Sequence, residues 1–106
     1  MEITKDTLKA FKIIYCEFKR RRKAGFTKID SLTFSDGELE SLPAFSKWLK
    51  PDIQTAFEEL KSAKCLKEDI IGNINITDSG LLFMENKPKE FFNDLTNLFD
   101  IVSLFI

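Results

Sequence analysis

The chain has 106 residues, which is the length of one domain, so we expect residues 1–106 to form a single domain. Hydrophobic residues make up 43% of it and include 11 Phe, and this supply of core side chains argues against a disordered chain. A zinc site is not expected, because the chain has no His and its only two cysteines, Cys16 and Cys65, are far apart in the sequence. We expect these cysteines to be two buried, reduced thiols.

Charge is divided unevenly along the chain, although the net charge is only −1. Residues 1–28 hold nine Lys and Arg against three acids, a net charge of +6, while residues 29–106 hold seven against fourteen, a net charge of −7. A basic first helix is therefore joined to an acidic remainder.

The first element is predicted to be a helix that begins at Thr4 or Asp6 and ends at Lys23, since either residue can cap it and apolar residues then recur at helical spacing. Gly25 marks its end. Cations in the last turns complement the helix dipole, so the simplest interpretation is a solvated helix end. A run this dense also favours binding of a polyanion or of an acidic surface, on another protein or on a second copy. The run consists of Lys19, Arg20, Arg21, Arg22 and Lys23.

Residues 26–34 are predicted to be a connection, with a short strand over residues 32–34. Ser35 and Glu38 have the spacing of a capping box, so a second helix is expected to begin there. Pro43 interrupts this helix and begins a further turn. The next helix is the clearest in the chain, because Pro51 suits a first helical position and an apolar stripe follows it.

A hairpin is predicted after that helix, since Gly72 and Asn73 stand between β-branched residues. Thr77 is expected to cap a short helix over residues 78–85, and a last helix is predicted over residues 88–106. The apolar face of the last helix is too wide for packing on one small domain, which favours a homodimer in addition to core packing. No membrane span is expected, because the apolar run is short and Asp94 and Asp100 interrupt it. Interfacial binding to a membrane is a minor alternative, because the polar side of this helix lacks Lys and Arg after Lys89. The predicted dimerisation residues are Phe91, Phe92, Leu95, Leu98, Phe99, Val102 and Phe105.

The stretch from residue 45 to residue 80 resembles a winged helix. Proteins of this family place an apolar residue early in their third helix and others four and seven positions later, as Ile53, Phe57 and Leu60 are placed here. They usually continue with a small turn and a Leu pair, to which Ala63–Leu66 is similar, although Lys64 stands where a Gly is common.

The residues after the hairpin extend the resemblance. Ile76-Thr77-Asp78-Ser79-Gly80 resembles the Leu-Thr-x-x-Gly that closes the wing in MarR-, PadR- and YjcQ-type proteins, and the small phage and prophage proteins of YjcQ type are similar in size. The resemblance implies a mainly α fold with a small β-hairpin, an α+β winged helix-turn-helix with an additional C-terminal helix.

The resemblance also implies a way of binding double-stranded DNA, in which the third helix enters the major groove and the wing touches the backbone. Gln54 and Thr55 would then read base edges, while Lys47 and Lys50 would hold phosphates. Three acids of the same helix oppose a polyanion, and the hairpin over residues 70–76 has no Lys or Arg, so it lacks the contacts that supply most non-specific affinity.

Two functions follow from these residues. The first is a small DNA-binding regulator of transcription, with a phage or mobile element as a possible origin. The alternative is a protein-interaction module with the same fold, an adaptor or an inhibitor of a host protein, that does not bind DNA. The chain has no His, no Gly-rich phosphate loop and no nucleophile elbow, so we expect neither enzyme activity nor a cofactor. The polar N-terminus shows no signal peptide, so we expect a cytoplasmic protein.

Overall fold

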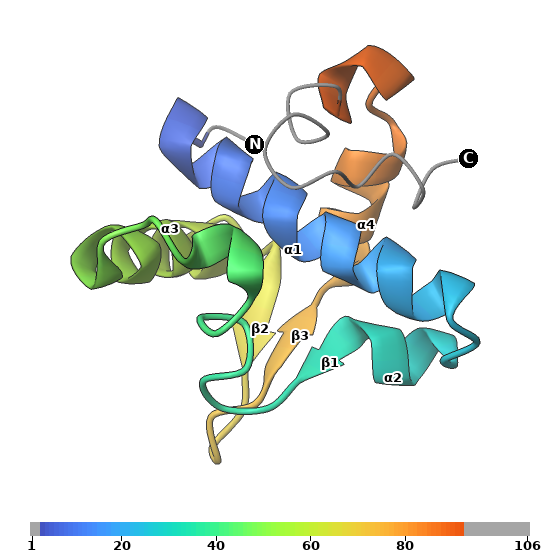
Figure 1. Ribbon diagram of the computed structural model, residues 1–106, viewed down its shortest axis with the longest axis horizontal. Helices are drawn as coiled ribbons and strands as arrows, with labels where there is room; N and C mark the ends of the chain where they lie inside the picture. Colours follow the sequence, from blue (N-terminus) through green and yellow to red (C-terminus); the bar gives the residue numbers. More distant parts are fainter. Residues whose placement is uncertain (1–2, 93–106) are drawn as a thin grey trace.

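The computed structural model describes residues 3–92, and these form a mainly helical α+β fold, as predicted (Figure 1). The predicted hairpin is joined by a third strand in one three-stranded antiparallel sheet. In chain order the elements are α1 (Lys5–Lys23), α2 (Lys28–Leu32), β1 (Thr33–Phe34), the 3₁₀ helix η1 (Pro43–Phe45), α3 (Lys50–Ser62), β2 (Leu66–Glu68), β3 (Ile74–Ile76), α4 (Asp78–Glu85) and the 3₁₀ helix η2 (Lys89–Phe92).

Helix α1 crosses the middle of the molecule and contacts α2, α3 and α4 (Figure 1). It begins where predicted, because the Thr4 side chain accepts a hydrogen bond from the Thr7 N–H. Beyond its end, Gly25 adopts a φ of +100°, which suits a residue without a Cβ. Phe11 and Ile14 are fully buried, and such side chains each contribute about 1.5–3 kcal/mol through burial. The helix is therefore the centre of the core.

The sheet has the strand order β1-β3-β2 and supports the core from below in Figure 1. Ile74 and Ile76 of β3 are buried, whereas Asn75 between them pairs with Thr33 on one side and Lys67 on the other. The Thr33 hydroxyl donates a hydrogen bond to the Asn75 side-chain oxygen over 2.7 Å. The alternation predicted for the second strand of the hairpin is thus confirmed.

The turn after α3 is joined to the start of α4 by the Thr-x-x-Gly sequence. The Thr77 hydroxyl accepts a hydrogen bond from the Gly80 N–H and lies 2.5 Å from the carbonyl oxygen of Lys64. A Cβ on Gly80 would lie 2.6 Å from the carbonyl oxygen of Cys65, so only glycine allows this close approach. Lys64 itself has a φ of +65°, in the left-handed region that glycine adopts more readily than other residues.

Two predictions about the segment between α1 and α3 are wrong. Residues 28–32 form α2, whose start is capped by the Thr27 side chain, and five residues are too few to show a helical period in the sequence. No α-helix begins at Ser35, although the Glu38 carboxylate accepts the Ser35 N–H as the capping box requires. Gly37 instead adopts a φ of +81° and the chain continues in turns as far as η1, which Pro43 begins.

The hairpin differs from the prediction in the length of its loop. Both strands are present, but the loop spans residues 69–73 rather than two residues. The Asp69 carboxylate accepts hydrogen bonds from the N–H groups of Ile71 and Asn73, and these bonds hold the longer loop. Ile70 and Ile71 therefore lie at its tip instead of in a strand.

The start of the predicted C-terminal helix is the 3₁₀ helix η2. Its Phe92 is buried and stacks on Tyr15 of α1 with ring centroids 5.7 Å apart, and Phe91 is half-buried. These two side chains contact the domain's own core. The other predicted dimerisation residues, Leu95, Leu98, Phe99, Val102 and Phe105, lie outside the described residues.

Candidate nucleic-acid interface

Helix α3 presents one face to the core and the other to solvent. Ile53, Phe57 and Leu60 are buried, whereas Gln54 and Thr55 are exposed, as their spacing predicts. Lys50 is exposed at the first position of the helix, and Lys47 is exposed in the turn that precedes it. The structure therefore places these four predicted DNA-contacting residues together around the N-terminal half of α3.

The acids of the C-terminal half of α3 are compensated by neighbouring groups. Lys61 Nζ lies 2.7 Å from a carboxylate oxygen of Glu58 and 2.7 Å from one of Glu68 on β2, and hydrogen bonds to these two groups raise the pKa of Lys61. A carboxylate oxygen of Glu59 accepts the Thr4 N–H over 2.6 Å. The remaining acid, Asp52, lies in the first turn, where the helix dipole favours a negative charge. Residues 47–55 carry two Lys and one Asp, a net charge of +1.

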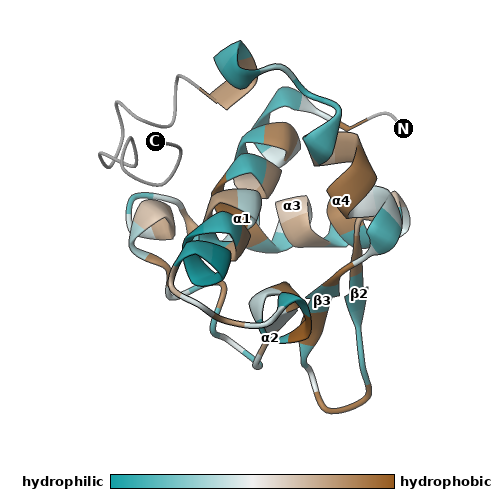
Figure 2. Ribbon diagram, turned by 90° about the vertical axis from the view of Figure 1, so that its right-hand side faces the viewer, coloured by the Kyte–Doolittle hydropathy of each residue, from teal (hydrophilic) through white to brown (hydrophobic). Residues whose placement is uncertain are grey.

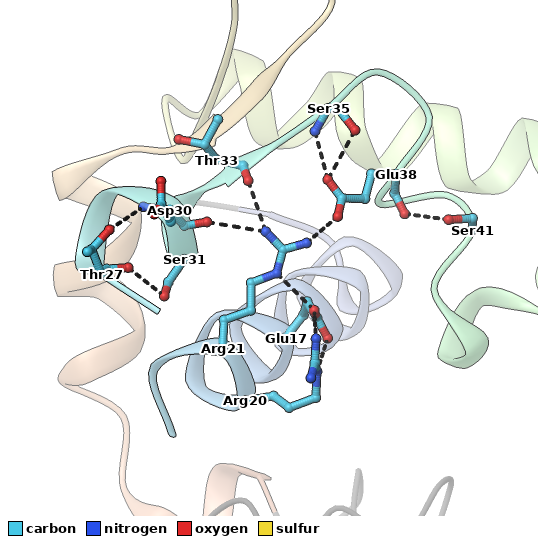
Figure 3. A network of polar contacts seen from close by, with 10 residues as sticks. All are labelled: Glu17, Arg20, Arg21, Thr27, Asp30, Ser31, Thr33, Ser35, Glu38 and Ser41. Carbon is cyan, nitrogen blue, oxygen red and sulfur yellow. Dashed lines mark hydrogen bonds and ion pairs between the residues drawn. The ribbon is translucent and has the colours of Figure 1, made fainter. Parts of the chain in front are cut away.

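The basic end of α1 is not a uniform cationic patch, because Arg21 is buried. Only 6% of it is exposed, so we remove Arg21 from the predicted DNA-contacting residues. Its Nε lies 3.0 Å from a Glu17 carboxylate oxygen, its Nη2 pairs with the Glu38 carboxylate, and its Nη1 donates to the Thr33 carbonyl over 3.0 Å (Figure 3). The guanidinium carbon also lies 4.4 Å from the centre of the Phe34 ring. Arg21 therefore connects α1 to β1 and to the turn that follows β1.

The other four cations of residues 19–23 differ in their exposure to solvent and in the groups with which they interact. Arg20 is half exposed but pairs with Glu17 through two hydrogen bonds of 2.8 and 2.7 Å. Partial burial opposes ionisation of Glu17, but the hydrogen bonds from Arg20 and Arg21 outweigh it and hold the pKa of Glu17 below its ordinary value. Arg22 is exposed and donates to the Phe26 carbonyl. Lys19 is half-buried with its Nζ 5.8 Å from the Tyr15 ring, and Lys23 is exposed.

Arg21 was predicted to contact DNA together with its cationic neighbours, although two features of the sequence distinguish it from them. Glu17 precedes it by four residues, which is the spacing of an ion pair on one helix face. Glu38 is the acid of the capping box, and its second carboxylate oxygen is the one that reaches Arg21. Contact with the Ser35 N–H, together with the charge of Arg21, lowers the pKa of Glu38.

The two predicted groups of DNA-contacting residues lie at different ends of the molecule. In Figure 1, α3 lies on the left, whereas the C-terminal end of α1 lies on the right beside α2. A groove of about 530 Å³ lies between α1 and residues 38–44, but its charged side chains, Glu17, Arg20, Arg21 and Glu38, are already paired with one another. The structure therefore brings together Lys47, Lys50, Gln54 and Thr55 but does not join the α1 cluster to them.

Comparisons with known proteins yield no match to a protein-family model, to a curated protein or to a solved structure. Within residues 3–92, no helix combines the length and apolar character needed to cross a membrane. The same residues contain no cluster of three or more acids and thiols with the geometry of a metal site. Burial raises the pKa of the Cys65 thiol to about 11, which disfavours the reactive thiolate.

Proposed function

We propose that this chain is a winged-helix protein that binds double-stranded DNA through the N-terminal half of α3. The observation that carries the proposal is the grouping of exposed Lys50, Gln54 and Thr55 on α3 with exposed Lys47 in the turn before it, on a helix that is followed directly by the β2–β3 hairpin. Residues near the start of a recognition helix are those that reach base edges in related DNA-binding motifs. In the C-terminal half of α3, Glu58 pairs with Lys61 and Glu59 accepts a hydrogen bond from the Thr4 N–H, and these contacts reduce the electrostatic repulsion between the two acids and a phosphate backbone.

Each copy offers few phosphate contacts in this arrangement. Lys47 and Lys50 flank the helix start, and Lys67 is the one cation among residues 65–76. Phosphate contacts supply most non-specific affinity, so a single copy should bind DNA weakly and with a shallow dependence on salt. Binding of a specific site would then rely on base contacts by Gln54 and Thr55 and on more than one copy.

A gel shift with a mixed pool of double-stranded DNA at low salt tests this proposal. The double variant Lys47→Ala with Lys50→Ala should lose binding to all sequences, whereas Gln54→Ala with Thr55→Ala should bind but select no sequence from the pool. The matched control removes two exposed cations from other elements, Lys9 of α1 and Lys89 of η2, and should bind normally. Absence of a shift for the native chain at low salt would rule the proposal out.

A second function, a protein-interaction module without DNA binding, is favoured by one specific observation. The hairpin loop that would approach the DNA backbone carries Ile70 and Ile71, which are 100% and 71% exposed, where cations would be needed. This function would be supported if the chain did not bind DNA at low salt but did bind a partner protein, and if that binding required the hairpin loop. We then expect Ile70→Ser with Ile71→Ser to abolish retention and the Lys47 and Lys50 variants to leave it unchanged.

A further inference from the structure

The tip of the hairpin is an exposed apolar point on a well-defined turn. Ile70 and Ile71, 100% and 71% exposed, form the hydrophobic end of the loop seen at the bottom of Figure 2. The Asp69 N–H donates to the Asn73 carbonyl over 2.9 Å, and the Asp69 carboxylate accepts two further backbone hydrogen bonds. The two isoleucines are thus held outward by an ordered loop, and an exposed apolar pair held in this way favours a contact with another surface.

Carboxylates lie beside this tip. Asp69 directly precedes Ile70, and the Asp36 side chain lies against the loop, because a Cβ on Gly72 would be 3.0 Å from the Asp36 Cγ. Glu68 is paired with Lys61, and Lys67 on β2 is the cation closest to the loop in sequence. We call Asp36 together with residues 69–73 the hairpin tip; it is apolar with a net negative charge of two.

A surface of opposite character lies where α1 meets α2. Ile29 is 74% exposed and Phe26 is 46% exposed, so this surface is also apolar. Its three exposed cations are Arg22, Lys23 and Lys28, and its one acid is Asp30. We call residues 22–30 the basic corner; its net charge is +2. In Figure 1 the hairpin points away from α2, so the two surfaces face different directions and one molecule does not bring its own tip onto its own corner.

We propose that the hairpin tip of one copy docks on the basic corner of a second copy. Each surface combines exposed apolar side chains with a net charge, and the net charges of the two surfaces are opposite in sign, −2 at the hairpin tip and +2 at the basic corner. Both occur once in every chain, so copies supply matching partners in equal number.

This contact is heterologous, because it joins two different surfaces of the chain, whereas an isologous contact joins the same surface of two copies. Copies joined in this way form a closed ring or a two-fold pair if the geometry closes, and an open row if it does not. The proposal does not depend on DNA binding. Where α3 does bind DNA, however, assembly would place several α3 helices on one duplex and would increase affinity without new contacts in any single copy.

Sedimentation of the full chain over a wide range of concentration, at low and high salt, tests the proposal. The native chain should associate as its concentration rises, and high salt should weaken the association because exposed charges are screened. The tip variant is Ile70→Ser with Ile71→Ser, and the corner variant is Lys28→Glu with Ile29→Ser. Each variant should weaken association about tenfold or more. The control is Leu82→Ser on α4, because Leu82 is a large apolar side chain that is 59% exposed and belongs to neither surface.

Mixing the two variants gives the decisive result. Each variant keeps one intact surface, so an equimolar mixture should form a complex of one tip variant with one corner variant, although each alone stays largely monomeric. Circular dichroism identical to that of the native chain confirms that the variants are folded. The proposal is overturned if the native chain is monomeric at every concentration, if both variants associate as the native chain does, or if the mixture forms no complex.

Discussion

Replacing Arg21 tests whether this residue has a structural role that its four cationic neighbours lack. Arg21→Met keeps most of the aliphatic volume and removes the guanidinium, which contacts Glu17, Glu38 and backbone carbonyls of residues 30 and 33 (Figure 3). The change leaves polar groups at the junction of α1, β1 and the following turn without their donor. We therefore expect a large loss of stability.

The size of this loss follows from the exposure of the groups left behind. Removing one partner of a buried ion pair costs about 3–5 kcal/mol. The Glu17 side chain is 11% exposed but still pairs with Arg20 after the replacement, and the Glu38 side chain is 38% exposed and can be solvated by water. The cost of leaving each carboxylate without Arg21 is therefore near the lower end of that range. The two carbonyls and the contact with the Phe34 ring add to the loss. We expect Arg21→Met to lower the free energy of unfolding by about 3 kcal/mol.

Urea denaturation followed by circular dichroism measures this difference. Arg22→Met is the matched control, because Arg22 is the next residue on the helix and is exposed, and its replacement should change stability by about 0.5 kcal/mol or less. Arg21→Lys keeps the charge but not the forked geometry, so its stability should fall between the native chain and Arg21→Met. If Arg21→Met and Arg22→Met unfold at the same urea concentration, the structural role assigned to Arg21 is wrong.

Three further predictions concern stability. Lys64→Gly should raise the free energy of unfolding by roughly 0.5–1 kcal/mol relative to Lys64→Ala, because Lys64 has a φ of +65° and glycine adopts this conformation without strain; chemical denaturation of the two variants checks it. Gly80→Ala should lower it by about 1–3 kcal/mol in the same assay, since the new Cβ would lie 2.6 Å from a backbone carbonyl oxygen. The folded state lowers the pKa of both Glu17 and Glu38, so their contribution is fully present above the ordinary glutamate pKa of about 4.3 and is lost as the pH falls through their lowered values. Arg21→Met should flatten this acid dependence in denaturation curves measured at a series of pH values, and an unchanged dependence would count against the ion pairs.

The sequence predicted those elements whose signals are local and long enough to be periodic. Helices α1 and α3 extend over several turns, and the Thr4 and Thr77 caps mark the starts of α1 and α4. Helix α2 was missed because five residues do not complete two turns. The capping-box contact at Ser35 formed without its helix, because a local hydrogen bond between Ser35 and Glu38 does not require the following residues to be helical.

The candidate site was predicted in part for the same reason. The exposure of Lys50, Gln54 and Thr55 follows from helical spacing within α3 itself. The burial of Arg21 depends on Glu38 and on the carbonyl of Thr33, which are distant in sequence and meet α1 only when β1 and its turn fold against the helix. Five consecutive cations look equivalent in a sequence, and tertiary contacts decide which of them remain on the surface.

The most direct test of the proposed DNA surface is the salt dependence of DNA binding by the native chain, compared with the Lys47→Ala, Lys50→Ala double variant. Two phosphate contacts per copy predict that log K falls with log salt with a slope of about −1.8 for each bound copy. The account predicts this slope for the native chain and for the Lys9→Ala, Lys89→Ala control, and little binding by the α3 variant. Unchanged binding by the α3 variant, or a slope lost only in the control, would contradict it.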